Sequence, residues 1–263
     1  MHSSIRKILI GIGINREDFS VAFSLCNVPE IEQFVAREEE LAEMHRMLRG
    51  DGSRRTVVLH GLGGVGKTQL TVAYAKRHKD SYSAVFWLNI KDEDSLRQSF
   101  AKAAKQIVRD HPSARRLSSV DIKEDLDGVI DAVKEWLSLP NNMRWLMIYD
   151  NYDNPKLPGN PDPAAVNIRK FLPESYQGSV IITTRSPQVE IGRPIQIRKL
   201  EDVLDDVKIL SNASRREGLM DGKGFYSIRV RWTAKYNARR RCYKACRGAR
   251  RSSSCASYGW SIS

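Results

Sequence analysis

A glycine-rich segment between two regular stretches constrains the fold of this chain more than any other feature. Residues 56–60 are largely apolar and β-branched, as in a buried parallel strand, and residues 69–78 have helix-forming composition without Pro or Gly. Between them lies the spacing G-x-x-x-x-G-K-T, at Gly61, Gly66, Lys67 and Thr68. Glycine lacks a Cβ, so such a backbone can curl around phosphate with its N–H groups pointing inward. The pattern predicts a strand, a phosphate-binding loop and a helix.

The loop residues have distinct expected roles. Lys67 should reach the β- and γ-phosphates of a nucleotide, and the Thr68 hydroxyl should hold Mg²⁺. The residues predicted to contact the nucleotide from this loop are Gly61, Gly63, Gly64, Val65, Gly66, Lys67, Thr68 and Gln69. An empty Gly-rich turn is the alternative, and the flanking strand and helix patterns argue against it.

Periodicity elsewhere predicts alternating strands and helices. Acidic residues early, basic residues late and apolar residues three or four apart predict a helix over residues 37–49. A second helix, capped by Asp94 or Ser95, should extend to about Ile107. The other predicted elements are strands at 84–90, 145–149, 179–185 and 194–197 and a helix at 123–139. We therefore predict an α/β fold, a P-loop NTPase three-layer sandwich whose parallel sheet is covered on both faces.

Three polar signals follow strands of the predicted sheet. Ligands of parallel sheets bind at the carboxyl ends of the strands, where the phosphate loop, Asp150 and Arg185 should all lie. An acid after an apolar strand, downstream of a phosphate loop, is the expected second half of a Mg²⁺-nucleotide site. Asp150 would then position the ion that Thr68 also touches. The alternative is a solvated aspartate at a strand end.

Charge is concentrated near the end of the chain. The formal net charge is +12, but residues 221–263 contribute +10 of it and the remaining 220 residues only +2. The composition, 41% hydrophobic and 28% charged, is typical of a soluble globular protein. The apolar run at 8–14 is shorter than the roughly 20 residues of a membrane span, and no signal-peptide cleavage pattern follows it. We expect no membrane span and a cytoplasmic location.

Five segments together resemble a known family. FVAREEEL (34–41), HGLGGVGKTQL (60–70), VFWLNI (85–90), WLMIYDN (145–151) and GSVIITTR (178–185) resemble, in order, the motifs of NB-ARC nucleotide-binding domains. These domains belong to the signal-transducing (STAND) P-loop ATPases, which include apoptotic and NOD-like immune receptors, and the wording is closest to fungal-type members. The resemblance covers about residues 28–220 and ends abruptly after that.

The resemblance implies that the nucleotide sets a switch. In the family, ADP holds a closed state, exchange for ATP opens it, and opening leads to homo-oligomerisation and signalling. Motif matching makes Arg185 the sensor of the γ-phosphate and, with Lys67 and Asp150, part of the catalytic set. Val35 and Arg37 would lie beside adenine and ribose, although Ala36 replaces the usual glycine between them. The expected cofactors are ATP or ADP with Mg²⁺.

Position 151 bears on hydrolysis. The family often has a second acid after the position of Asp150, proposed to help activate water, whereas this chain has Asn151, which cannot accept a proton at neutral pH. We therefore expect slow hydrolysis, so that the chain is at most a slow ATPase. Asp153 is the nearest acid that could substitute.

The expected organisation has four parts. Residues 1–27 form an N-terminal segment without an evident domain, residues 28–200 the nucleotide-binding domain, residues 201–220 the start of a helical subdomain, and residues 221–263 a basic tail without a core period. The tail is either disordered, or an anchor for nucleic acid or anionic membrane, or out of frame. Codons chosen for residues 246–263 can be read one nucleotide forward as AAALDGLPLALAMVGAYL, which contains the family's GLPLA motif. We therefore favour a retained intron that begins near Gly222.

Two other functions remain open at this stage. A stand-alone P-loop ATPase or kinase would show steady turnover or an acceptor pocket. A nucleic-acid-binding protein would lose strongly salt-dependent affinity on deletion of residues 221–263. We expect no nucleic-acid partner, because the tail has no recognisable reading module.

Overall fold

The computed structural model describes residues 19–25, 37–49 and 53–200. All of them belong to the first of two units into which the chain divides, residues 1–201. The predictions for Val35, Ala36 and residues 201–263 lie outside the described residues.

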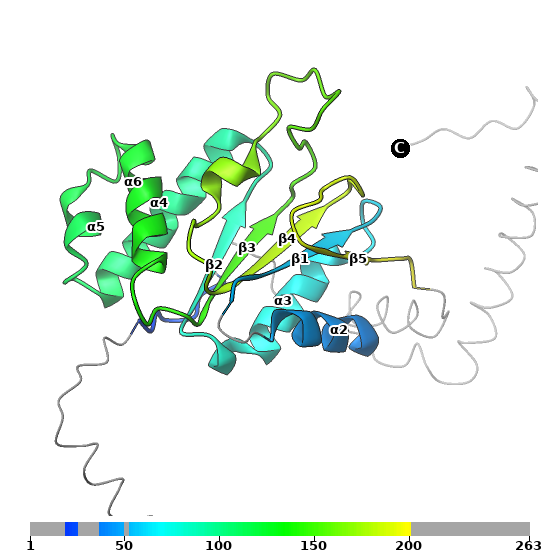
Figure 1. Ribbon diagram of the computed structural model, residues 1–263, viewed down its shortest axis with the longest axis horizontal. Helices are drawn as coiled ribbons and strands as arrows, with labels where there is room; N and C mark the ends of the chain where they lie inside the picture. The colour runs from blue at the N-terminus through cyan, green and yellow to red at the C-terminus, as the bar shows by residue number, and fades with distance from the viewer. Residues whose placement is uncertain (1–18, 26–36, 50–52, 201–263) are drawn as a thin grey trace, which may run out of the picture. The chain divides into compact units, whose positions relative to one another are not determined.

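A five-stranded parallel sheet forms the centre of the fold, in the order β2-β3-β4-β1-β5 (Figure 1). The strands are β1 Arg55–His60, β2 Ala84–Asn89, β3 Trp145–Asp150, β4 Ser179–Thr184 and β5 Arg193–Gln196. Every residue of β3 and β4 is buried, because helices cover both faces of these central strands. This explains why their sequences are continuous apolar runs and do not alternate.

Helices form the two outer layers. The helices are α2 Glu38–Leu48, α3 Lys67–Arg77, α4 Glu93–Asp110, α5 Arg115–Ser119 and α6 Leu126–Leu137, and the short 3-10 turns are η1 Lys79–Ser81 and η2 Ile168–Phe171. Figure 1 shows α2 and α3 on one face of the sheet and α4, α5 and α6 on the other. The α/β three-layer prediction is therefore confirmed.

Each face of the sheet has its own apolar core. In β2, Phe86 and Leu88 pack into the cluster shared with α4 and α6, whereas Val85 packs into the cluster shared with α2 and α3. The split follows from the alternation of side chains along a strand. Both cores bury large apolar area, and this burial stabilises the sheet edge at which the predicted site residues lie.

The start of α4 differs from the sequence-based expectation. Its N-cap is Asp92, whose carboxylate accepts a hydrogen bond of 2.7 Å from the backbone N–H of Ser95. Asp92 is extended, so its side chain can turn back onto the first helical turn, while Asp94 is already helical. The short helix α5 was not predicted, because it offers only one buried apolar residue, Leu117.

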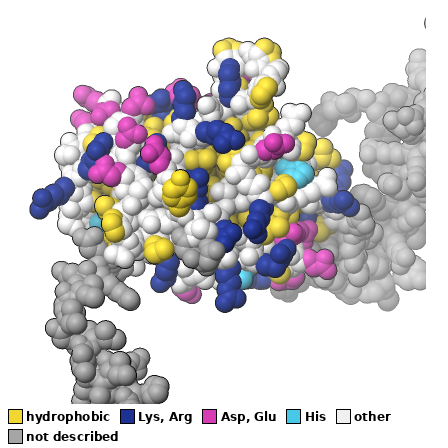
Figure 2. Space-filling view, viewed as in Figure 1, with side chains coloured by type: hydrophobic (Ala, Val, Ile, Leu, Met, Phe, Trp, Pro, Cys, Tyr) yellow, Lys and Arg dark blue, Asp and Glu magenta, His cyan; other side chains and the backbone are white. Residues whose placement is uncertain are grey.

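The strand order brings the predicted site together. The phosphate loop follows β1, Asp150 ends β3, and Arg185 follows β4, which lies between the other two strands. On the face shown in Figure 2, Lys and Arg side chains are interspersed with Asp and Glu side chains. None of the helices in the described ranges combines the length and the apolar character that crossing a bilayer requires.

Candidate functional site

The phosphate loop links β1 to the N-terminus of α3. Gly64 and Gly66 have φ angles of 76° and 92°, a left-handed backbone that glycine adopts without steric cost. Gly61 is needed for a different reason, since a Cβ there would lie 2.3 Å from the carbonyl oxygen of Ile197. The loop leads directly into an eleven-residue helix, whose N-terminus adds partial positive charge. This backbone fits an anionic phosphate group.

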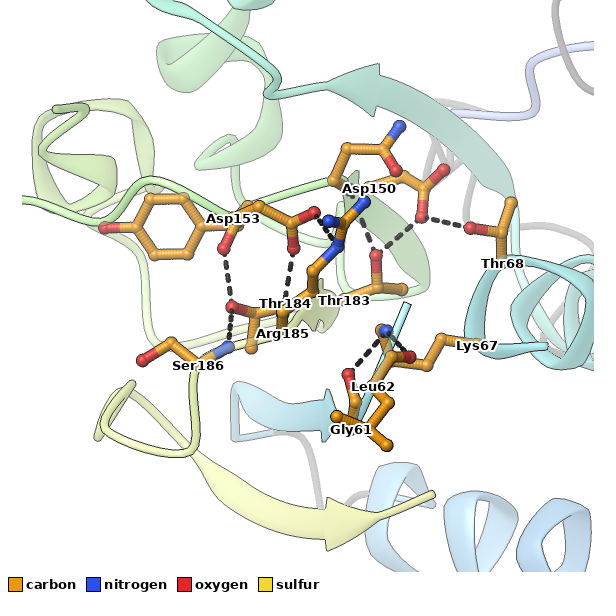
Figure 3. Close-up of polar contacts among 12 residues, drawn as sticks. Gly61, Leu62, Lys67, Thr68, Asp150, Asp153, Thr183, Thr184, Arg185 and Ser186 are labelled. Atoms are coloured by element: carbon orange, nitrogen blue, oxygen red, sulfur yellow. Dashed lines mark hydrogen bonds and ion pairs between the residues drawn. The ribbon is translucent and has the colours of Figure 1, made fainter. Parts of the chain in front are cut away.

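Lys67 folds back over the loop that precedes it. Its Nζ donates hydrogen bonds to the carbonyl oxygens of Gly61 at 2.8 Å and Leu62 at 3.0 Å, as Figure 3 shows. The side chain is buried, and burial lowers the pKa of the ammonium, an effect that the charge of Asp153 opposes. The loop thus holds the cation where a bound phosphate would meet it.

Asp150 accepts hydrogen bonds from two hydroxyl groups on different elements. Its Oδ1 lies 2.9 Å from Oγ1 of Thr68 and 2.6 Å from Oγ1 of Thr183 (Figure 3). The side chain is 4% exposed, and burial raises the pKa of this carboxyl group, while the two hydroxyl hydrogen bonds lower it. Thr183 was not among the sequence-predicted site residues, because within a β-branched strand it looks like any other strand residue.

The surroundings of Asp150 fit a divalent cation. Within the described part of the chain, no lysine or arginine forms an ion pair with this carboxylate. A buried carboxylate beside the Thr68 hydroxyl offers the hard oxygen donors that Mg²⁺ prefers. The predicted pair of Thr68 and Asp150 is therefore in contact and chemically suited to the ion.

Arg185 lies against the phosphate loop. A Cβ built on Gly63 would stand 3.4 Å from Cζ of Arg185, so the guanidinium group packs over the loop backbone. Asp153 contacts this arginine twice: its Oδ1 accepts a hydrogen bond of 2.8 Å from the backbone N–H of Arg185, and its Oδ2 forms an ion pair with Nε at 2.7 Å (Figure 3). The sequence had offered Asp153 only as a replacement acid.

A cavity of about 260 Å³ joins these groups. It is lined by loop residues from Gly63 to Gln69 other than Val65, and by Asn151, Asp153, Thr183 and Arg185. Asp150 instead lines an adjoining groove, which shares Thr68 and Asn151 with the cavity. The loop, Lys67 and Arg185 thus surround one space large enough for phosphate groups.

Arg37 stands apart from this cavity. Its guanidinium Nη2 donates to the carbonyl oxygens of Val65 and Arg198, both at 2.8 Å, and its Nη1 pairs with Glu40 at 2.9 Å. The residue is buried and has a φ angle of 70°, a conformation uncommon outside glycine. These bonds support the phosphate loop from α2; contact with a nucleotide's ribose stays a prediction.

Asn151 occupies the position of the expected second acid. Its φ angle of 68° turns the chain directly after β3. Its backbone N–H donates to Oγ1 of Thr183 at 3.0 Å, and its Nδ2 donates to Oδ1 of Asn89 at 3.3 Å. The site therefore places an amide beside the cavity at this point.

The chain is similar in sequence to known proteins. A family model described as an AAA ATPase domain matches residues 33–173. A nucleotide-binding leucine-rich repeat (NLR)-like protein of Hyaloscypha variabilis is 28% identical over 179 residues, which cover 64% of this chain and 17% of that protein. The chain thus spans less than a fifth of the length of this relative.

Two similar solved structures are archaeal. Cdc6p of Pyrobaculum aerophilum is 16% identical with a TM-score of 0.46, over 74% of this chain and 54% of that one. ORC1 of Aeropyrum pernix, solved in complex with DNA, is 18% identical with a TM-score of 0.49, over 75% of this chain and 54% of that one. The family model, by contrast, spans more than half of the chain and includes the phosphate loop and Asp150. On that evidence the chain belongs to the AAA ATPase domain family of P-loop ATPases.

Proposed function

We propose that this domain is an ADP/ATP-binding signalling switch of a NOD-like receptor-type protein, with slow or no ATP hydrolysis. The observation that carries the proposal is the placement of Arg185 against the phosphate loop, opposite the Thr68–Asp150 pair and beside Lys67. A cation in that place would meet a γ-phosphate, which ATP has and ADP lacks. The site therefore has a means of distinguishing the two nucleotides.

The residues divide the work of binding. Backbone N–H groups of the loop and Lys67 would hold the β-phosphate, and Thr68 with Asp150 would hold Mg²⁺. Mg²⁺, when bound, would neutralise charge on the phosphate oxygens. Arg185 would donate to the γ-phosphate. Arg37 would keep the loop in shape through the Val65 carbonyl.

One arginine contact does not complete a switch. Moving a two-state equilibrium from 1:99 to 99:1 takes about 5.5 kcal/mol of differential binding. A hydrogen bond between charged groups contributes roughly 1.5–3 kcal/mol. We therefore propose that contacts other than that of Arg185 supply the remainder, and that the ATP-bound form assembles with other copies.

Slow hydrolysis follows from the residue at position 151. An amide cannot take a proton from an attacking water, and Asp153, the nearest acid, is already engaged by Arg185 through one hydrogen bond and one ion pair. Asn151 has a left-handed backbone conformation that Asp also tolerates, so Asn151→Asp can introduce a carboxylate without changing the chain path.

The test is a comparison of binding and turnover in the 263-residue chain. We expect Mg²⁺-dependent binding of both ADP and ATP by calorimetry, less than one turnover per minute, and faster hydrolysis in Asn151→Asp. Lys67→Ala should lose binding of both nucleotides. Brisk multiple turnover by the unmodified chain, abolished in Asp150→Ala, would contradict the slow switch.

One observation favours a second candidate, a stand-alone ATPase or kinase. The groove that adjoins the phosphate cavity has a volume of about 590 Å³, and polar residues of α4 such as Gln98 and Lys102 line it. A polar groove beside Asp150 could seat a phosphoryl acceptor. Transfer of labelled phosphate from ATP to a small hydroxyl compound, with loss in Lys102→Ala, would favour this function over the switch.

A further inference from the structure

We propose that Asp153 determines the preference between ATP and ADP by positioning Arg185. This inference rests on the proposed function and deepens it, because it assigns the preference to a residue outside the phosphate loop and the strand-end acid. Asp153 acts through Arg185 and is a positioning residue.

A single carboxylate fixes both ends of Arg185. One oxygen of Asp153 accepts a hydrogen bond from the backbone N–H, and the other forms an ion pair with Nε of the side chain. The hydrogen bond sets where the arginine leaves β4, and the ion pair draws the guanidinium group toward the carboxylate. Two simultaneous contacts with one carboxylate restrict rotation about the side-chain torsions.

The arginine needs this support. Its side chain is 66% exposed, so the contact with Gly63 alone leaves most of it without packing neighbours. Long exposed side chains lose considerable rotamer entropy when a ligand orders them. Because Asp153 holds Arg185 from outside the phosphate loop, a γ-phosphate would meet a preorganised donor.

The bond pattern leaves the required donors available. A guanidinium group has five N–H donors on three nitrogens, and the ion pair with Asp153 involves only Nε. Among the described residues, the two terminal nitrogens of Arg185 have no acceptor, and the guanidinium carbon lies beside Gly63 of the loop. Asp153 therefore holds the guanidinium group at Nε and leaves its two terminal nitrogens available to bind phosphate.

The path of the chain explains why Asp153 is in reach. After β3, the left-handed turn at Asn151 returns the chain toward β4, where the Tyr152 N–H donates to the Thr183 carbonyl oxygen at 2.9 Å. Asp153 comes next and faces the residue that follows β4. The contacts between Asp153 and Arg185 thus depend on the turn at Asn151, directly after Asp150.

The experiment measures affinities for Mg²⁺-ADP and for Mg²⁺ with a non-hydrolysable ATP analogue, using the 263-residue chain and its variants. Asp153→Ala and Arg185→Ala should each weaken analogue binding by roughly three- to tenfold and leave ADP binding within about twofold, as loss of one charged contact would. Asp153→Asn should resemble Asp153→Ala, because an amide can still accept from the backbone N–H but has no charge with which to pair Nε.

A matched control and a double variant complete the test. Asp127→Ala also removes an exposed Asp–Arg pair, with Arg97, but far along the chain on α6, and should leave both affinities unchanged. The variant lacking both Asp153 and Arg185 side chains should bind the analogue no more weakly than Arg185→Ala alone, because Asp153 acts through the arginine.

Three results would overturn the inference alone. The first is tighter binding of the ATP analogue in Asp153→Ala, as expected if the carboxylate repels the γ-phosphate. The second is an equal loss of affinity for the analogue and for ADP. The third is a loss of analogue affinity in the double variant that equals the sum of the two single losses. If the unmodified chain binds neither nucleotide, the proposed function fails, and this inference fails with it.

Discussion

Replacing Asp150 with asparagine should stabilise the nucleotide-free protein, although it removes the carboxylate expected to hold Mg²⁺. Burial raises the pKa of this group, so the folded state disfavours its charged form. An asparagine of nearly the same shape carries no charge, and its carbonyl oxygen can still accept hydrogen bonds from Thr68 and Thr183. Activity and stability should therefore change in opposite directions.

The contrast with alanine provides the magnitude. Thr183 is 1% exposed, and in Asp150→Ala its hydroxyl would lose a buried acceptor, at a cost of about 1–3 kcal/mol. Thr68 is only half-buried and can turn to water. We expect a loss of about 2 kcal/mol for Asp150→Ala, or roughly 4–8 °C in Tm for a domain of this size. For Asp150→Asn we expect a Tm above that of the unmodified protein, because the buried charge is removed while both hydroxyl hydrogen bonds are kept.

The pH dependence has a definite sign. Because the folded pKa of Asp150 is raised above its ordinary value of 3.8, the folded protein keeps the proton where the unfolded chain has lost it. Its contribution to stability therefore falls as the pH rises through the interval from 3.8 to the folded pKa. Below 3.8 the carboxyl group is neutral in both states, and the advantage of Asp150→Asn should shrink.

The assay is thermal unfolding followed by circular dichroism, with chelator present and no nucleotide, at pH 7.5 and at acidic pH. Calorimetry on the same samples measures Mg²⁺-ATP binding, which should weaken in Asp150→Asn while the Tm rises. A Tm for Asp150→Asn below that of the unmodified protein at pH 7.5 would refute the reasoning, because it would mean that the buried charge is compensated within the protein.

Three further perturbations test other parts of the structure. Gly61→Ala would bring a Cβ against a backbone carbonyl beyond β5 and should cost more than about 2 kcal/mol, measured by urea unfolding. Arg37→Lys should lower nucleotide affinity, because a single ammonium cannot replace the guanidinium bonds to two carbonyls; unchanged calorimetric affinity would contradict this. Burial lowers the pKa of His78, which stacks on His45 at 4.1 Å. The unfolded chain therefore takes up the proton first, so stability should fall as the pH drops below 6.5, and His78→Phe should reduce that loss in denaturation at pH 5 to 8.

Periodicity predicted most of the fold because nearly all of the strands and helices are buried on at least one face. The strand predicted at 145–149 and the helix at 123–139 appear as β3 Trp145–Asp150 and α6 Leu126–Leu137. The prediction of the residue that caps α4 was wrong. Asp92, Asp94 and Ser95 can all cap a helix, and only the backbone conformation selects Asp92.

Part of the candidate site could also be predicted from the sequence, and part could not. Spacing identified Lys67 and Thr68, and strand ends identified Asp150 and Arg185, because these positions follow from the parallel sheet. The contact of Asp153 with Arg185 depends on a turn after β3, at which Asn151 has a positive φ angle. The sequence Asn151-Tyr152 does not predict such a turn. Tertiary packing decides such contacts.

The bonds of Arg37 have a consequence for how signals could pass through the domain. One guanidinium group joins the carbonyl of Val65 in the phosphate loop to that of Arg198, near the start of the segment that follows β5. A displacement at either carbonyl changes the same pair of hydrogen bonds. Thermodynamic linkage then requires reciprocity. If nucleotide binding favours a movement of the chain at Arg198, a partner that causes the same movement must strengthen nucleotide binding by the same free energy.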